Sequence, residues 1–192
     1  MRPLLKIQKT ASFQTRKMIG TGIFMSKLIY LMPLWAGCED YIVTALQVIQ
    51  NKAARSITKL SYFTPTKTIL KSCQWMSVRQ LMTYHSLVLL YKTLKHKTPE
   101  YLHDRVTSGG HFPYNTRQAA TCPEGFSFNV QHPIDSGTVR QVSGNKMELS
   151  KLGWCWRSVD IYNTIPNHIR LETKIQDFKK KLKTWVDHNF FI

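Results

Sequence analysis

The sequence predicts a mainly α protein: a basic helical bundle at residues 1–107, a loop-rich insert at 108–146 and a small helical lobe at 147–192. Three observations favour this fold class. Apolar residues recur at steps of three and four between residues 41 and 60, which is the period of one helix face. Ser77 and Gln80 form a capping-box pattern ahead of a long apolar segment. Glycines and prolines punctuate residues 108–146, where they favour turns over regular structure.

The first 38 residues are basic and then apolar. Residues 1–18 have the composition of a mitochondrial transit peptide. The same basic bias continues through the first half of the chain, so we expect an ordinary basic helix there instead. Residues 19–38 are about long enough to cross a membrane. Lys27, Pro33, Gly20 and Gly22 interrupt them, and we therefore expect a buried helix that breaks at Pro33.

The segment from Tyr41 to Leu60 is predicted to form an amphipathic helix. Its expected apolar face consists of Ile42, Leu46, Ile49, Ala53, Ile57 and Leu60. Lys52, Arg55 and Lys59 recur at the same steps on another face, about 130° away at 100° per residue. A basic stripe of this kind is either a solvated surface or a binding surface for an anionic partner.

The strongest helix signal follows the capping box, and it predicts a central helix over residues 78–95. Its apolar residues cover more than one face, so we expect Leu87 to be buried on a helix that faces Leu46. His85 lies within this apolar surface and is expected to be a core residue, not a ligand or a base. Shorter helices are expected at Pro65–Ser72, with Thr64 as the N-cap, and at residues 98–102.

The second half of the chain alternates loops with short elements. Phe126–Gln131 alternates apolar and polar residues, which predicts a strand in a short β-hairpin with Val139–Val142. Arg117 lies near Tyr114 in the same insert and is a candidate contact for a phosphate or for a neighbouring side chain. Helices are expected at residues 154–165, 166–170 and 173–188, the last with an apolar stripe of Ile175, Phe178, Leu182 and Trp185.

The charge of the chain is large and unevenly distributed. The 192 residues carry a formal charge of +16. Residues 1–99 hold 15 lysines and arginines against Glu39 and Asp40, whereas residues 100–192 hold 12 basic and 9 acidic side chains. A surface that serves solubility alone normally mixes both signs. The one-signed first half therefore indicates a polyanionic partner, with nucleic acid as the leading candidate and an anionic membrane surface as the second.

Other functional classes receive little support from the sequence. Cys38, Cys73, Cys122 and Cys155 are scattered, without the spacing of a zinc site, and we expect reduced thiols in an intracellular, nuclear or cytoplasmic protein that is not secreted. No phosphate-binding glycine loop, nucleophile elbow or zinc-protease motif occurs. We therefore expect no catalytic residues, no metal site and no cofactor.

Several segments resemble one protein family in the same order along the chain. Ser26–Tyr30, Leu34–Cys38 and Leu46–Arg55 resemble the region just after the catalytic palm of non-long-terminal-repeat retrotransposon reverse transcriptases, of the jockey-like type. The later segments that are similar are Leu87–Leu94, Thr98–Leu102, Asn115–Gln118, Ile161–Arg170 and Phe178–Lys183. Each motif is weak alone, and their collinear order over about residues 5–188 carries the resemblance.

The resemblance implies a thumb-like domain and carboxyl-terminal region that grip the template and the nascent strand. The family's polymerase activity needs an Asp-Asp pair that holds two metal ions, and this sequence contains no such pair. The resemblance thus implies a non-catalytic remnant, whose partners are the phosphate backbone of RNA or DNA and the missing palm region of the parent protein.

The expected function is nucleic-acid binding through a basic helical surface, without base specificity and with no membrane partner. The candidate contact residues are Lys52, Arg55, Lys59, Lys67, Lys71 and Arg117. Two alternatives remain open at this point. The first is a protein-interaction module that docks an acidic partner, and the second is a truncated gene model with no independent function.

Overall fold

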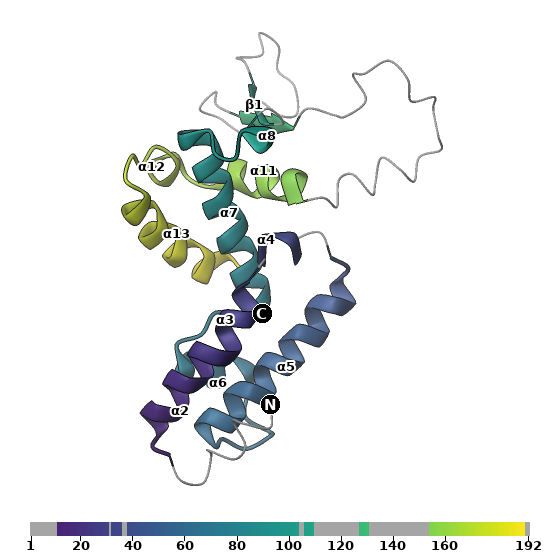
Figure 1. Ribbon diagram of the computed structural model, residues 1–192, viewed down its shortest axis with the longest axis vertical. Helices are drawn as coiled ribbons and strands as arrows, with labels where there is room; N and C mark the ends of the chain where they lie inside the picture. Colours follow the sequence, from purple (N-terminus) through teal and green to yellow (C-terminus); the bar gives the residue numbers. More distant parts are fainter. Residues whose placement is uncertain are drawn as a thin grey trace, which may run out of the picture. The chain divides into compact units, whose positions relative to one another are not determined.

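The computed structural model describes residues 11–30, 32–35, 38–103, 106–109, 127–130 and 154–190 (Figure 1). These residues are mainly helical, which confirms the predicted fold class. The chain forms two compact units, one of Met1–Met82 with Val186–Ile192 and the other of Thr83–Trp185. The division falls inside the long helix α7 (Val78–His96), and the domain limits expected at residues 107 and 146 remain a prediction.

The first unit begins with a helical path that changes pitch. Helix α2 (Phe13–Ile19) continues into the π-helical turn η1 (Gly20–Met25) and then into α3 (Ser26–Ile29). Tyr30 ends this path with an extended backbone, and α4 (Met32–Trp35) follows. The predicted break at Pro33 is therefore wrong, since the helix already ends at Tyr30. Pro33 lies in the first turn of α4, a position that accepts proline because its N–H would be unpaired there anyway.

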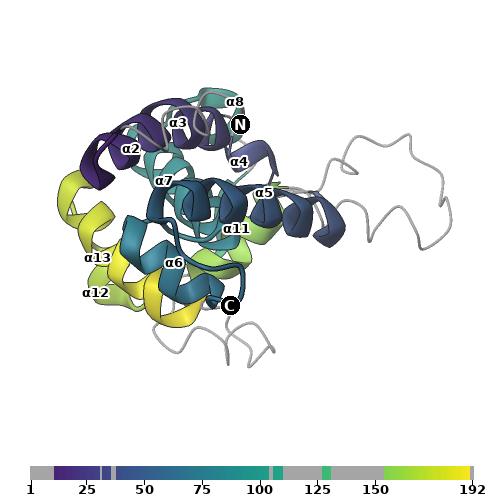
Figure 2. The same cartoon turned by 90° about the horizontal axis from the view of Figure 1, so that it is seen from below.

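Helices α5 (Asp40–Thr58) and α6 (Thr66–Cys73) pack side by side in the first unit (Figures 1 and 2). The predicted extent of α5 is correct to within two residues, but its predicted apolar face is only partly right. Ala53 and Ile57 are buried as expected, whereas Ile49 and Leu60 are exposed and Gln50 is completely buried. The buried residues of α5 are Val43, Gln50, Ala53, Ala54, Ser56 and Ile57.

A close approach and a buried cation join the first helical path to α5. A Cβ built on Gly20 would lie 2.4 Å from Cδ1 of Ile57, so any other residue here would require the Ile57 side chain to shift. The buried Arg16 donates a hydrogen bond of 2.8 Å from Nε to the carbonyl of Ile57 in the last turn of α5. A cation at this position also suits the negative end of the helix dipole.

The start of α7 is held by the predicted capping box and by α5. The backbone N–H of Ser77 donates to Gln80 Oε1 at 2.8 Å, and the Gln80 N–H donates to Ser77 Oγ at 3.3 Å. The Val78 N–H donates to Gln47 Oε1 at 2.9 Å, and Gln50 Nε2 donates to the Met76 carbonyl at 2.8 Å. These bonds satisfy the polar groups that burial would otherwise leave unpaired at this end of the helix.

The second unit places short elements around the rest of α7. They are α8 (Glu100–His103), strands β1 (Val106–Gly109) and β2 (Ser127–Val130), and helices α11 (Trp154–Thr164), α12 (Asn167–Arg170) and α13 (Ile175–Asn189). The last turn of α13, from Val186, belongs to the first unit. The strands pair antiparallel, with Val106 opposite Val130. The predicted strand at 126–131 is confirmed and its described partner is β1, while residues 139–142 lie outside the described part of the chain.

The core of this unit forms around Tyr91 of α7. The ring of Tyr91 stacks on Phe178 of α13 with 4.0 Å between centroids, and its hydroxyl donates to the Glu172 carbonyl at 2.6 Å. Leu87 is completely buried, as predicted. Leu46, in the first unit, is only half-buried, so the prediction that it is a core residue is wrong.

Candidate nucleic-acid interface

The predicted contact residues of the first unit lie on α5, on α6 and at the start of the loop between them. Lys52 is exposed on α5, and Lys67 and Lys71 are exposed one turn apart on α6. Lys59 is also exposed, but it lies just past the end of α5 as its C-cap, with a left-handed φ of 59°. Arg117 lies outside the described residues. We call Lys52, Lys59, Lys67 and Lys71 the basic surface.

Side-chain hydrogen bonds fix α5 and α6 to each other next to these lysines. Asn51 Nδ2 donates to Thr66 Oγ1 at 3.1 Å, which joins the residues that precede Lys52 and Lys67. Arg55 Nη2 donates to the Thr64 carbonyl at 3.4 Å, immediately before α6. The lysines of the basic surface therefore project from a backbone that is already held in one arrangement.

Arg55 makes contacts within the first unit that the sequence did not predict, while its contact with nucleic acid remains a prediction. It is half-buried, and its guanidinium carbon lies 5.2 Å from the centroid of the Tyr62 ring. Its Nε–H is buried and donates no hydrogen bond to any of the described residues. The expectation that Arg55 belongs to a wet stripe is wrong. Arg55 holds the loop of residues 60–64 against α5 through the Thr64 carbonyl and the Tyr62 ring.

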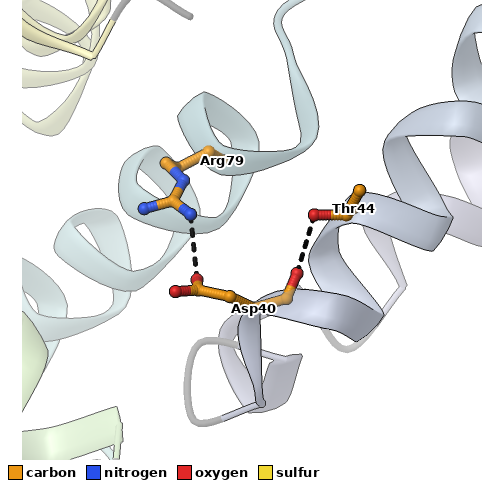
Figure 3. A network of polar contacts seen from close by, with 3 residues as sticks. All are labelled: Asp40, Thr44 and Arg79. Carbon is orange, nitrogen blue, oxygen red and sulfur yellow. Dashed lines mark hydrogen bonds and ion pairs between the residues drawn. The ribbon is translucent and has the colours of Figure 1, made fainter.

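The two carboxylates of residues 1–82, Glu39 and Asp40, are both at the N-terminal end of α5. The Asp40 carboxylate forms an ion pair with Arg79 at 2.9 Å, and the Asp40 backbone carbonyl accepts a hydrogen bond of 2.9 Å from the Thr44 hydroxyl (Figure 3). Twelve residues of helix separate Asp40 from Lys52, or about 18 Å along the axis. This exceeds the screening length of about 8 Å at physiological salt, so the acidic end does little to neutralise the basic surface.

Two aromatic residues at this site were not predicted as functional. Tyr62 is 79% exposed and Phe63 is 91% exposed, both in the loop between α5 and α6. The signal in the sequence is an aromatic pair in a loop of a few residues between two helices that carry lysines.

Other chemically active side chains do not form a second site in the described residues. Burial raises the pKa of the Cys73 thiol to about 11, an effect that nearby Lys17 partly offsets. This thiol is therefore neutral and poorly nucleophilic. Burial also lowers the pKa of His85, and the charge of Lys179 lowers it further. His85 is half-buried against Tyr84, not part of the fully buried core.

The described part of the chain contains neither a metal-ligand cluster nor a membrane-spanning helix. There, no three histidine, cysteine or acidic side chains gather as ligands of a metal ion. None of the helices described combines the length and the apolar character that crossing a bilayer requires.

No protein-family model, no curated protein and no solved structure matches this chain. The resemblance to retrotransposon reverse transcriptases therefore rests on the sequence segments alone and remains a prediction.

Proposed function

We propose that this protein binds the phosphate backbone of nucleic acid through the basic surface of α5 and α6, without base specificity and without catalysis. The observation that carries the proposal is the set of four exposed lysines on α5, at its C-cap and on α6, two helices that hydrogen bonds hold together. The sequence contains no carboxylate between Tyr41 and Pro99 that would neutralise them.

The kind of cation supports backbone binding over base reading. An ammonium group is a compact, hydrated point charge on a flexible stem, and it suits a phosphate oxygen without fixing an orientation. Lys67 and Lys71 are one turn apart, or about 6 Å along α6, so both reach neighbouring phosphates of one strand. Contacts of this type position a protein on nucleic acid but carry no sequence information.

The resemblance to a reverse-transcriptase thumb agrees with this role, because the thumb grips nucleic acid without performing the chemistry. In that interpretation the chain is a remnant that lacks the palm. The polymerase part is tested by supplying purified protein with primed RNA, nucleotides and Mg²⁺ or Mn²⁺. We expect no primer extension. Extension that survives repurification and is lost when one aspartate is changed would contradict the non-catalytic proposal.

Binding itself is tested by salt titration against single-stranded RNA, duplex DNA and an acidic protein. If the four lysines neutralise about four phosphates, log affinity falls against log salt with a slope of about −2.8 for single strands and about −3.6 for a duplex. Affinity should not depend on base sequence. Tight binding to the acidic protein, with no binding to either nucleic acid, would instead support a protein-interaction module.

A further inference from the structure

The loop between α5 and α6 has a conformation that its own hydrogen bonds hold. The Thr64 N–H donates to the Ser61 carbonyl at 3.1 Å, which closes a turn around Tyr62 and Phe63. The Phe63 N–H donates to Ser61 Oγ at 3.4 Å. The two aromatic side chains thus extend from a formed turn, and their exposure is a property of the fold.

The two rings are arranged at a right angle to each other. Their centroids are 5.9 Å apart and their planes meet at 83°. Arg55 approaches the Tyr62 ring at 5.2 Å and restricts that ring, whereas Phe63 is 91% exposed. The geometry leaves the Phe63 ring open to a flat partner. Large apolar groups that lie together in water commonly mark an interaction surface.

We infer that the loop of residues 60–64 is a stacking platform for unpaired bases, on which Phe63 receives a base and Tyr62, braced by Arg55, supports its neighbour. This inference rests on the proposed function and deepens it: the preferred ligand is a single strand. Lys59 and Lys67 flank the loop in sequence and are both exposed, so they are placed to hold the phosphates on either side of the stacked base.

Charge and shape together favour a single strand over other partners. The surroundings of the rings are basic, with no carboxylate in the sequence from residue 41 to residue 99, which matches a polyanion that also offers flat apolar faces. In a duplex these faces are already covered by neighbouring base pairs, whereas an unpaired strand exposes them. Stacking tolerates every base, so it also agrees with binding that lacks sequence specificity.

The experiment compares intact protein and Phe63→Ala on three ligands at one salt concentration. The ligands are a short single-stranded RNA, the same RNA with its central bases removed to leave abasic sites, and a duplex of the same sequence. For the intact protein we expect affinity for the abasic RNA to be lower by about 5- to 150-fold, the range reported for loss of one stacked base. Phe63→Ala should lower affinity for the intact RNA by a similar factor and bind both RNAs equally.

Two further variants serve as controls for Phe63→Ala. Tyr41→Ala removes another exposed aromatic, 72% exposed at the acidic end of α5, and should leave all affinities unchanged. Phe63→Trp keeps an aromatic face and should retain preference for the intact RNA. Because Phe63 is on the surface, both variants at this position should fold like the parent, which circular dichroism verifies.

The outcomes separate this inference from the proposed function. Failure to bind any of the three ligands would overturn both. Salt-dependent binding that is equal for intact, abasic and duplex ligands, and insensitive to Phe63→Ala, would overturn the stacking platform and leave backbone binding in place. Loss of affinity for intact and abasic RNA alike in Phe63→Ala would also overturn it, because the ring would then act on something other than bases.

Discussion

The chain has two lysine-rich regions that differ in their acidic neighbours and in the exposure of their aromatic side chains. The region in and around α13 contains acidic residues among its lysines. The acidic residues are Glu172, Asp177 and Asp187, and the lysines are Lys174, Lys179, Lys180, Lys181 and Lys183. Lys181 forms an ion pair with Glu172, and Phe178 is completely buried. Around α5 and α6 the lysines have no acidic neighbours in the sequence, and Phe63 faces water. The number of lysines therefore does not define a site; their separation from carboxylates and the exposure of aromatic rings do.

The sharpest test of this contrast replaces one phenylalanine in each region. Phe178→Ala should lower the free energy of unfolding by about 3–5 kcal/mol, because the ring is fully buried and stacks on Tyr91. Phe63→Ala should change it by no more than about 0.5 kcal/mol, as expected for an exposed side chain. Urea denaturation measures both values. Equal losses would show that Phe63 is part of the core and not an open surface.

The next largest effect concerns two cations with different partners, Arg55 and Lys181. Arg55→Ala should cost about 1–2 kcal/mol, because it removes the bond to the Thr64 carbonyl and the contact with Tyr62. Removal of its unsatisfied Nε offsets part of that loss. Lys181→Ala breaks only an exposed ion pair with Glu172 and should cost less than about 1 kcal/mol. A smaller cost at Arg55 than at Lys181 would mean that Arg55 does not hold the loop.

A third test uses the unusual backbone of Lys59. A left-handed φ costs a residue with a Cβ about 1–2 kcal/mol, and glycine avoids this cost. Lys59→Gly should therefore raise the free energy of unfolding by about 1 kcal/mol while removing one cation of the basic surface. Lys52→Gly, in the middle of α5, should instead lower it by about 1 kcal/mol. Thermal unfolding of the pair checks the opposite signs, and destabilisation by both would refute the left-handed cap.

The smallest expected effect is on the pH dependence of stability, through His85 and the nearby Lys179 of α13. Because the folded-state pKa of His85 is lowered, the unfolded chain takes up a proton first as the pH falls. The contribution of His85 to stability should therefore be fully present above its unfolded pKa of about 6.5. It should decline as the pH falls below this value towards the pKa of the folded state. His85→Gln should remove this decline, and Lys179→Gln should reduce it. A decline of the same size in His85→Gln would assign it to other groups.

Local signals predicted the helices well. The capping box places the start of α7 correctly, and the observed end at His96 is one residue from the predicted one. The same three- and four-residue periodicity located α5 and α13 to within two residues at each end. These signals are contained within one or two helical turns, so they do not depend on the rest of the fold.

The face of α5 could not be predicted in the same way. Hydropathy ranks Ile49 above Gln50, yet Ile49 is 43% exposed and Gln50 is fully buried. The difference arises because the Gln50 amide donates to the Met76 carbonyl, which removes the usual cost of burying it. Arg16 is buried for the same reason, through its bond to the Ile57 carbonyl. Such partners are distant in sequence, and periodicity alone contains no information about them.

The candidate site also contains features that the sequence predicts and features that it does not. The exposure of Lys52, Lys67 and Lys71 was predictable from their residue type and helical spacing. The inward turn of Arg55 was not, because it depends on how the loop after α5 folds back on the helix. The pairing of β1 with β2 was missed for a related reason, since the two strands are separated by 17 residues of sequence.

The most direct measurement compares two triple variants of equal charge, Lys52→Gln/Lys67→Gln/Lys71→Gln and Lys179→Gln/Lys180→Gln/Lys183→Gln. Each is titrated with single-stranded RNA over a range of salt concentrations. If the basic surface of α5 and α6 holds the backbone, the first triple should flatten the slope of log affinity against log salt by about two units. The α13 triple should leave the slope close to that of the parent. Equal flattening by both triples, or no change in the first, would contradict a binding site on α5 and α6.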